Sequence, residues 1–334
     1  MPGPKTAILL TRSMQARCFA EADLRRIATF AELSLADRDE ISGDVQRSAM
    51  GGAEIIVTGW GTLPISPALL DAAPNLRLMC HAAGSVKHLV NDEFRRRRIR
   101  VCSAASALAV GVAEFAFGMM LVTMKAVWQF RSLTAQGRWG REQPIDWVRE
   151  PYEATVGIIG ASFVGREMIR LCRQLSLKAM LLYDPYVSAD EAAAIGARKV
   201  ELDELMRRSD VVSLHAPATD ETQRMVNARN LALLKDRAII INTARGACVD
   251  EPALISELQS GRIFACLDVT DPEPPAPGSP LYNLPNCVLT PHIAGAIKEN
   301  TFRQGKLVAD QIESYVQGGR LPGEVNLEQL RRLA

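Results

Sequence analysis

The stretch that decides the fold is Thr155–Asp184, TVGIIGASFVGREMIRLCRQLSLKAMLLYD. Its first five residues form a short apolar, β-branched run that predicts a buried strand. A glycine turn and a helical pattern follow, and residues 179–183 predict a second strand that ends at Asp184. A strand, a glycine turn, a helix and a second strand ending in an acid make up a dinucleotide-binding βαβ unit. The stretch therefore predicts a parallel α/β sheet with a dinucleotide site.

The glycine turn departs from the G-x-G-x-x-G pattern at one position, because Ser162 stands where the middle glycine is expected. Gly160 still permits the tight turn, and Gly165 lets the helix pack closely on the strand. The helix N-terminus offers free N–H groups to a pyrophosphate. Asp184 would accept hydrogen bonds from the adenosine ribose hydroxyls and repel a 2′-phosphate, which favours NAD over NADP. The alternative is an ordinary βαβ unit in which Asp184 only caps a turn.

Composition narrows the class of protein. The chain has 334 residues, enough for two domains, and is 48% hydrophobic and 23% charged, as in a soluble globular enzyme. Its formal net charge of +1 argues against charge-driven binding to nucleic acid or to a membrane surface. The seven cysteines are scattered without a CxxC pair, which predicts reduced core residues of a cytoplasmic protein.

One apolar segment, residues 104–124, is long enough to cross a membrane. Glu114 lies in its middle, and a central carboxylate costs about 2.5–3.5 kcal/mol on insertion. Glycines and other small residues dilute its hydrophobicity further. We therefore expect a buried helix. The apolar run near the N-terminus spans only four residues and predicts a strand, not a signal peptide.

Strand and helix patterns alternate along the chain, which is typical of parallel α/β domains. In the first portion, strands are expected at residues 6–10, 53–58, 76–82 and 100–102, and helices at 21–32 and 66–73. A long helix from about residue 110 to 136 would close this portion. Beyond Asp184, strands are expected at 211–214, 238–242, 266–269 and 288–290, and a helix at about 298–318 ends the fold.

Three polar residues near predicted strand ends could carry chemistry: Arg245, Glu273 and His292. Hydride transfer to a carbon that bears oxygen requires a proton at that oxygen, and histidine titrates in the suitable range. A carboxylate can fix the orientation of the histidine, and a guanidinium can hold a substrate carboxylate with paired hydrogen bonds. The alternatives are a surface salt bridge for Arg245, a solvated loop acid for Glu273 and a structural histidine. No histidine or cysteine spacing suits a metal ion.

Three motifs carry a resemblance to a known family: NTARGACVDE at residues 242–251, LDV with PEP within residues 267–274, and LTPHIAG at residues 289–295. With them, the chain resembles the D-isomer-specific 2-hydroxyacid dehydrogenases over nearly its whole length. The resemblance implies two parallel-sheet α/β domains, Rossmann-like and flavodoxin-like. An NAD-binding domain, residues 107–296, would be inserted into a discontinuous substrate domain, residues 1–106 and 297–334. It also implies two hinge helices and a homodimer formed through the cofactor domain.

The resemblance implies roles for individual residues. Arg245 would bind the substrate, Glu273 would pair with the histidine, and His292 would donate or accept the proton. The backbone N–H groups of Ala83, Gly84 and Ser85 would also grip the substrate carboxylate. Thr243 and Asp268 would lie near the nicotinamide. The full set of residues implied at the cofactor is Gly160, Ser162, Phe163, Val164, Gly165, Asp184, His215, Pro217, Thr222, Thr243, Ala244, Arg245, Asp268, His292 and Gly295.

Some positions depart from the family pattern and bear on the substrate. Val86 stands where an aspartate is common, and Leu108 where an asparagine is frequent. Trp60 and Gly61 replace the basic residue that would meet the phosphate of phosphoglycerate, and Trp60 is either a core plug or a pocket wall. We therefore predict an NAD-dependent reductase of small 2-oxo acids that acts reversibly on D-2-hydroxy acids. The alternative is an NAD(H)-sensing, corepressor-like protein of the same fold.

Overall fold

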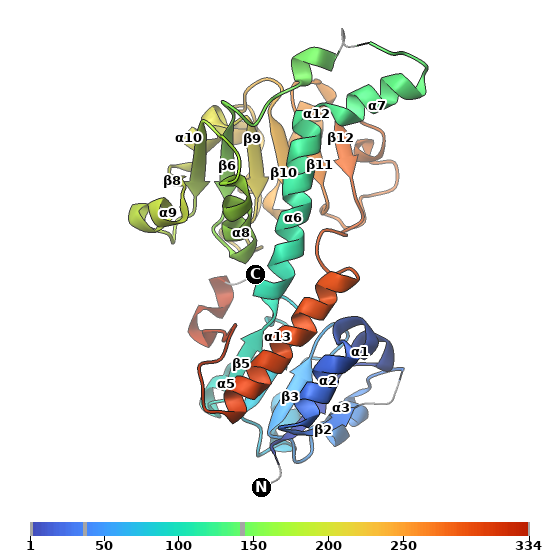
Figure 1. Ribbon diagram of the computed structural model, residues 1–334, viewed down its shortest axis with the longest axis vertical. Helices are drawn as coiled ribbons and strands as arrows, with labels where there is room; N and C mark the ends of the chain where they lie inside the picture. The colour runs from blue at the N-terminus through green and yellow to red at the C-terminus, as the bar shows by residue number, and fades with distance from the viewer. Residues whose placement is uncertain (1–2, 36–38, 141–143, 333–334) are drawn as a thin grey trace. The chain divides into compact units, whose positions relative to one another are not determined.

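The computed structural model describes residues 3–35, 39–140 and 144–332, and it divides into two compact units (Figure 1). The smaller unit contains the described residues up to Leu108 and from Ala296 onward, and the larger unit is Ala109–Gly295. The larger unit thus interrupts the sequence of the smaller one. The boundaries expected from the sequence, after residues 106 and 296, lie within two residues of this division.

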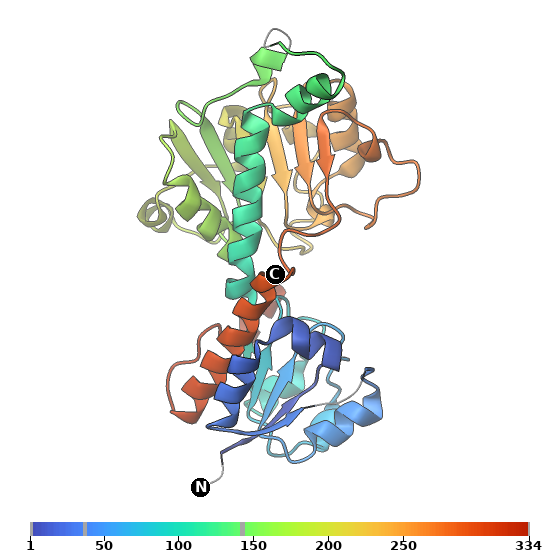
Figure 2. The same ribbon diagram turned by 45° about the vertical axis from the view of Figure 1, so that its right-hand side comes forward.

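The smaller unit is built on a five-stranded parallel sheet. Its strand order is β2 (Glu32–Leu35), β1 (Lys5–Ile8), β3 (Ile55–Thr58), β4 (Leu78–His81) and β5 (Arg100–Ser103). This is the order of the flavodoxin-like doubly wound fold. One face is covered by α1 (Arg12–Cys18), α2 (Glu21–Ala28) and α13 (Glu299–Val316), as Figure 2 shows. The other face is covered by α3 (Gly43–Met50), α4 (Pro67–Asp71), α5 (Asp92–Arg96) and η4 (Leu327–Arg332).

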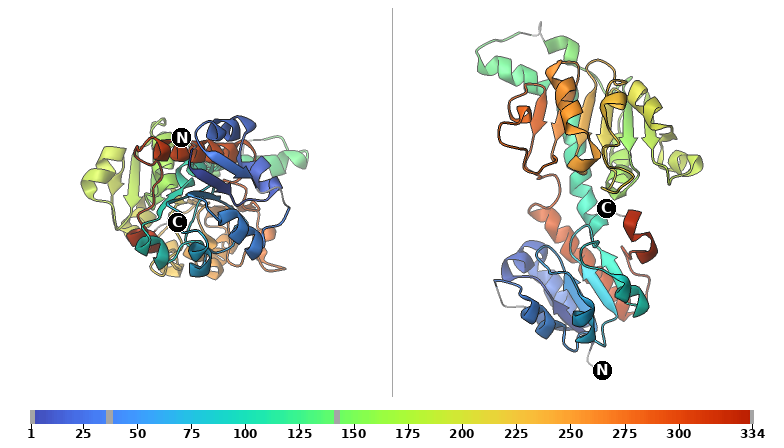
Figure 3. Two further views of the ribbon diagram at one scale, coloured as in Figure 1. Left: turned by 90° about the horizontal axis from the view of Figure 1, so that it is seen from below. Right: turned by 180° about the vertical axis from the view of Figure 1, so that it is seen from behind.

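The larger unit is built on a seven-stranded parallel sheet. Its strand order is β12 (Cys287–Leu289), β11 (Phe264–Leu267), β10 (Ile239–Asn242), β9 (Val211–Leu214), β6 (Thr155–Ile159), β7 (Ala179–Tyr183) and β8 (Arg198–Lys199). The face in front in Figure 1 is covered by α6 (Ala105–Met124), α8 (Phe163–Cys172) and α9 (Ala189–Ile195). The opposite face, seen from behind in Figure 3, is covered by α10 (Leu202–Arg208), α11 (Ala228–Leu231) and α12 (Glu251–Gln259). Two parallel-sheet α/β units confirm the predicted fold class.

Two expectations for the helices were wrong. The single helix expected from about residue 110 to 136 is two helices, α6 and α7 (Val127–Ala135), separated at Ala126, whose φ is 51°. The helix expected over residues 21–32 ends at Ala28, and residues 32–35 form the edge strand β2 instead. The two-residue strand β8 was not expected. The remaining strands lie where the apolar runs predicted, within about two residues.

Helix α6 is long and apolar enough to cross a membrane by length and composition, with a mean hydropathy of 1.9 over its most apolar window. Its buried residues include Ala113, Ala116, Met120 and Met124, which pack in the core on one face of the seven-stranded sheet. Glu114 lies on the exposed side. Only 33% of that window is buried, so the helix packs on the sheet by one face and is not the fully buried helix that was expected.

Candidate active site

The order of the seven strands reverses direction between β6 and β9. In open α/β sheets, ligands bind at the carboxyl ends of the strands beside such a switch point. Here the two loops at that point are the glycine turn, residues 160–165, and the segment His215–Pro217. The fold therefore places two of the predicted cofactor segments where a ligand is expected.

The glycine turn has no room for larger residues at its first and last glycines. Gly160 has φ +91°, and a Cβ atom there would lie 2.8 Å from the backbone nitrogen of Ala216. A Cβ on Gly165 would lie 2.0 Å from the carbonyl oxygen of Gly160. Both glycines are thus required by close backbone contacts and not only by flexibility.

Ser162 needs no glycine-like backbone, because its φ is −62°. It is the N-cap of α8, and its Oγ accepts a hydrogen bond from the backbone N–H of Gly165 at 3.3 Å. Serine is among the residues that best cap a helix. The substitution at the middle glycine position is therefore accommodated and also satisfies one of the N–H groups at the start of α8. Phe163 and Val164 form the first turn of the helix.

Asp184 fastens the glycine turn to the end of the second strand. Its Oδ2 accepts a hydrogen bond from the N–H of Ala161 at 2.8 Å, and its Oδ1 accepts one from the N–H of Tyr186 at 2.8 Å. Asp184 therefore does cap a turn, which is the alternative role considered from the sequence. A carboxylate oxygen can accept more than one hydrogen bond, so the predicted contact with a ribose stays a prediction.

Two buried polar atoms near this edge of the sheet have no hydrogen-bond partner among the residues that the structure describes: Nδ1 of His215 and Oγ1 of Thr243. His215 follows β9, and its Nε2 shares a hydrogen bond with Oγ of Ser213 at 2.9 Å. Burial lowers the pKa of His215 to about 3, so its ring is neutral near neutral pH. Thr243 follows β10. Buried polar atoms are ordinarily hydrogen-bonded, so a bound ligand could supply the missing partners of these two atoms. Together with the glycine turn, they fit a polar dinucleotide.

His292 and Glu273 form the closest pair of candidate catalytic groups. Nδ1 of His292 lies 2.6 Å from Oε1 of Glu273, and the two side chains are 51% and 44% exposed. His292 follows β12, and Glu273 lies in the proline-rich loop after β11, so neighbouring strands deliver them. The predicted pairing is present in the structure, and both groups remain open to a small molecule.

Arg245 lies in the turn after β10, beside the strand that leads to Glu273. Its side chain is exposed, and its Nη1 donates a hydrogen bond to the carbonyl of Ala244 at 2.6 Å. Within the described ranges, no hydrogen bond joins Arg245 to the His292–Glu273 pair. A Cβ on Gly246 would lie 2.0 Å from the carbonyl carbon of Thr270. The arginine turn therefore packs backbone against backbone on the segment that leads to Glu273.

Asp268 has contacts that the sequence did not reveal. It is 2% exposed and directly follows β11. Among the described residues, its carboxylate accepts hydrogen bonds only from the loop that carries His292. The sequence motifs show that Asp268 precedes this loop in the chain. They do not show that its carboxylate accepts hydrogen bonds from the loop. The other predicted cofactor residues lie at the same edge. Thr222 donates its Oγ1 hydrogen to the carbonyl of Pro217 at 2.6 Å. Gly295 is the last residue of the larger unit.

The predicted carboxylate-binding loop belongs to the smaller unit. Ala83, Gly84 and Ser85 follow β4, and Oγ of Ser103 donates a hydrogen bond to the carbonyl of Gly84 at 2.7 Å. Trp60 follows β3 and packs, partly buried, against the core beneath α1, α2 and α13. The guanidinium of Arg17 lies 5.8 Å from the centre of the Trp60 ring.

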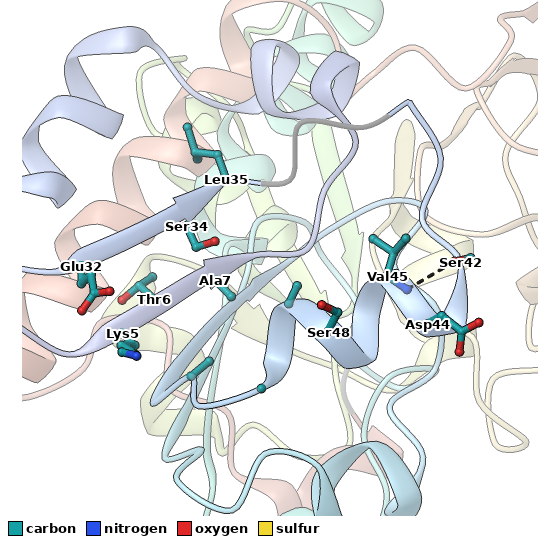
Figure 4. A pocket seen from close by; sticks show the side chains of 13 residues that line it. Lys5, Thr6, Ala7, Glu32, Ser34, Leu35, Ser42, Asp44, Val45 and Ser48 are labelled. Carbon is teal, nitrogen blue, oxygen red and sulfur yellow. Dashed lines mark hydrogen bonds between the residues drawn. The ribbon is translucent and has the colours of Figure 1, made fainter.

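A cavity of about 770 Å³ lies elsewhere in the smaller unit, between β1, β2 and α3 (Figure 4). Its polar lining includes Lys5, Glu32, Ser34 and Asp44. None of the predicted site residues borders it. In the part of the chain that the structure describes, no group of three or more histidine, cysteine, aspartate or glutamate side chains could hold a metal ion.

Comparisons with known proteins agree with the geometry. Residues 117–294 match the model of the D-isomer specific 2-hydroxyacid dehydrogenase, NAD binding domain. The chain is 34% identical over 260 residues to D-3-phosphoglycerate dehydrogenase of Archaeoglobus fulgidus, covering 78% of this chain and 49% of that protein. It is 32% identical over 274 residues to glyoxylate reductase of Korarchaeum cryptofilum, covering 80% and 81%. The chain spans about half the length of the D-3-phosphoglycerate dehydrogenases that it matches.

A solved structure gives the same picture. D-lactate dehydrogenase from Aquifex aeolicus, in complex with NAD and lactic acid, aligns with a TM-score of 0.71 and 25% identity. The alignment covers 93% of this chain and 96% of that one.

Proposed function

The chain belongs to the D-isomer-specific 2-hydroxyacid dehydrogenase family, and from this premise we propose that it reduces a small 2-oxo acid reversibly to its D-2-hydroxy acid. Its cofactor is NAD. The observation that carries the proposal is the 2.6 Å contact between His292 Nδ1 and Glu273 Oε1, at the carboxyl edge of the NAD-binding sheet.

The residues of the chain divide the chemistry among them. The glycine turn, the N-terminus of α8, His215 and Thr243 would hold the cofactor, which supplies the hydride for C2 when it is bound. Glu273 accepts the Nδ1 hydrogen of His292, which leaves the Nε2–H of the protonated ring to donate its proton to the substrate oxygen. In the oxidation direction the same nitrogen takes the proton back. Arg245 binds the substrate carboxylate with paired hydrogen bonds.

We further propose that the substrate carries no phosphate. Trp60 and Gly61 stand where the family would have a basic residue that meets the phosphate of phosphoglycerate. The guanidinium of Arg17 lies over the Trp60 ring and donates a hydrogen bond to the carbonyl of Ala296. Its guanidinium is therefore already engaged. Glyoxylate and hydroxypyruvate, which appear in the names of matching relatives, carry no phosphate and are the substrates that we propose.

The test is a panel of NADH and NADPH oxidation rates with glyoxylate, hydroxypyruvate, pyruvate, bulkier 2-oxo acids and 3-phosphohydroxypyruvate. We expect turnover with NADH and an unphosphorylated 2-oxo acid. A preference for the phosphorylated acid would refute the substrate class. NADH binding without turnover of any acid would favour the sensing protein instead.

Two variants test the assigned roles. His292→Ala should lose turnover while NADH binding persists, because the imidazole moves the proton and does not carry the cofactor. Arg245→Ala should chiefly raise KM. Arg208→Ala is the matched control, since that exposed arginine pairs only with Glu204 on α10. Loss of NADH affinity as the sole effect of His292→Ala would contradict its role.

We also propose a homodimer formed through the larger unit. Helix α7 has no buried residue, and in the sequence that follows it Trp139 is 94% exposed and Tyr152 69% exposed. Large apolar side chains left exposed in this way favour a protein–protein interface. Analytical ultracentrifugation should find a dimer that Trp139→Glu weakens. A monomer at micromolar concentrations would refute the proposal.

A further inference from the structure

We propose that Asp268 is a positioning residue, whose buried carboxylate holds the loop that carries His292 in the conformation that aims the imidazole at Glu273. The inference rests on the proposed function, because it concerns the proton-transfer group of that reaction. It differs from the role near the nicotinamide that the family resemblance implies for Asp268.

The first argument is the number of hydrogen bonds that Asp268 makes to one loop. Its Oδ1 accepts from Oγ1 of Thr290 at 2.6 Å and from the N–H of Ile293 at 2.8 Å. Its Oδ2 accepts from the N–H of Ala294 at 2.9 Å, and its backbone carbonyl accepts from the N–H of His292 at 3.0 Å. The remaining residue of this loop segment is Pro291, which has no N–H to donate. Asp268 therefore fixes the loop on both sides of the histidine.

The second argument is the backbone of His292. Its φ is +51°, in the left-handed region that residues other than glycine rarely adopt. Such a conformation persists only where the surrounding structure over-determines it. The hydrogen bonds to Asp268 supply that constraint. Without them the loop can relax toward negative φ, and the imidazole would then leave Oε1 of Glu273.

The third argument is that this carboxylate serves the loop alone. It is 2% exposed, and across the described ranges no lysine or arginine forms an ion pair with it. A buried carboxylate is costly unless hydrogen bonds satisfy it, and here the three bonds from the loop do so. An asparagine would put an amide N–H₂ group where one oxygen now accepts, so that a donor would face a donor.

The experiment compares Asp268→Ala and Asp268→Asn with Asp210→Asn as the matched control. Asp210 is also a buried carboxylate of the larger unit, but it lies at the opposite, amino edge of the sheet. There it accepts from the N–H of Thr155 and forms ion pairs with Arg149 and Lys235. For Asp268→Ala we expect kcat to fall about a hundredfold, as a misplacement of about 1 Å can cause. NADH affinity should change by less than about tenfold. The loss should therefore appear in kcat and not in NADH affinity, while Asp210→Asn should leave both unchanged.

A second readout needs neither substrate nor cofactor. In the free chain, the amide protons of Ile293 and Ala294 should exchange with solvent at least about tenfold faster in Asp268→Asn than in the wild type. If Asp268→Ala fails to fold, Thr290→Val removes one donor and should lower kcat by a smaller factor. NADH affinity that falls in step with kcat, with amide exchange unchanged, would overturn the inference and leave the proposed function intact. A wild-type chain without turnover would refute the proposed function, while amide exchange would still test the loop.

Discussion

Ser162 offers a test that separates two roles of the glycine turn, capping α8 and admitting a pyrophosphate. Its Oγ accepts from the N–H of Gly165 at 3.3 Å, which is long for a cap. Loss of an N-cap serine to alanine costs about 0.5–2 kcal/mol, and its replacement by glycine a few tenths. Given the long bond, we expect Ser162→Ala to destabilise the free chain by about 0.5–1 kcal/mol and Ser162→Gly by less.

The effect on NADH should follow a different order. Ser162→Gly restores the usual middle glycine and should change affinity by less than about tenfold, or 1.4 kcal/mol. Ser162→Asp keeps a good cap and suits the positive end of the helix dipole, so its stability should match that of the wild type. Its carboxylate would, however, meet the pyrophosphate. Two unit charges about 4 Å apart repel by roughly 1 kcal/mol in water and 4 kcal/mol at an effective dielectric of 20. This range predicts NADH binding that is weaker by about fivefold to several hundredfold.

The assays are urea unfolding of the free chain and titration of NADH followed by fluorescence, on all four proteins at one salt concentration. In Ser162→Asp we expect the free energy of unfolding to match that of the wild type while NADH affinity is lower. If that variant binds NADH as tightly as the wild type, the pyrophosphate does not lie at the N-terminus of α8. If it is as unstable as Ser162→Ala, the side chain at this position is not acting as a cap.

Three further predictions test the cofactor unit and the stability of the smaller unit. Gly165→Ala should abolish NADH binding and lower stability, since its Cβ would lie 2.0 Å from a backbone oxygen; unchanged NADH titrations would contradict this. Asp184→Ala should weaken NADH binding about tenfold through the lost hydrogen bonds to the glycine turn and narrow the preference over NADPH, measured as the ratio of the two dissociation constants. Burial lowers the pKa of His81 to about 3, below its unfolded value near 6.5. Between these two pH values the unfolded chain binds more protons than the folded chain, so the free energy of unfolding decreases as the pH is lowered. Urea unfolding should show roughly 1 kcal/mol lost through His81 between pH 6 and pH 5 and a similar loss through His215, whose pKa burial also lowers to about 3. His81→Gln should therefore remove about half of the slope, and an unchanged slope would refute the assignment.

The parts of the fold that the sequence predicted are those that local patterns determine. The central strands are mostly apolar, so their runs stand out in the sequence. The two glycines of the turn form a known pattern, and the structure shows the steric reason for both. The edge strand β2 carries no such pattern, because three of its four residues are exposed, and it pairs only with β1. Its formation depends on a free strand edge about 27 residues earlier in the chain, which no local pattern records.

The break between α6 and α7 has the same kind of cause. Residues 125–126 are lysine and alanine, which favour helix. The helix ends there because distant groups satisfy its last turn. The N–H of Arg149 donates to the carbonyl of Met124 at 2.6 Å, and Nε1 of Trp128 donates to Oγ1 of Thr123 at 3.0 Å. Tertiary contacts thus override the helical preference of the sequence.

At the candidate site, the motifs predicted the histidine–glutamate pair, because both residues lie in stretches of recognisable composition. They did not predict the surroundings of Asp268. Whether a carboxylate after a strand faces a cofactor or the next loop depends on the packing of β11 against β12. The pairing of β11 with β12 cannot be read from the sequence around Asp268. The positioning role proposed for Asp268 follows from this pairing.

The contact of Gly246 with Thr270 limits how this protein can be redesigned. Any side chain at position 246 would drive apart two backbones that are already touching, so the arginine turn and the glutamate loop cannot be varied independently. Selection for a new substrate, in nature or in the laboratory, would therefore leave this part of the chain unchanged. The adjustable positions would be those of the smaller unit, such as Trp60 and the loop at residues 83–85. A mutant library for altered substrate range should be directed there.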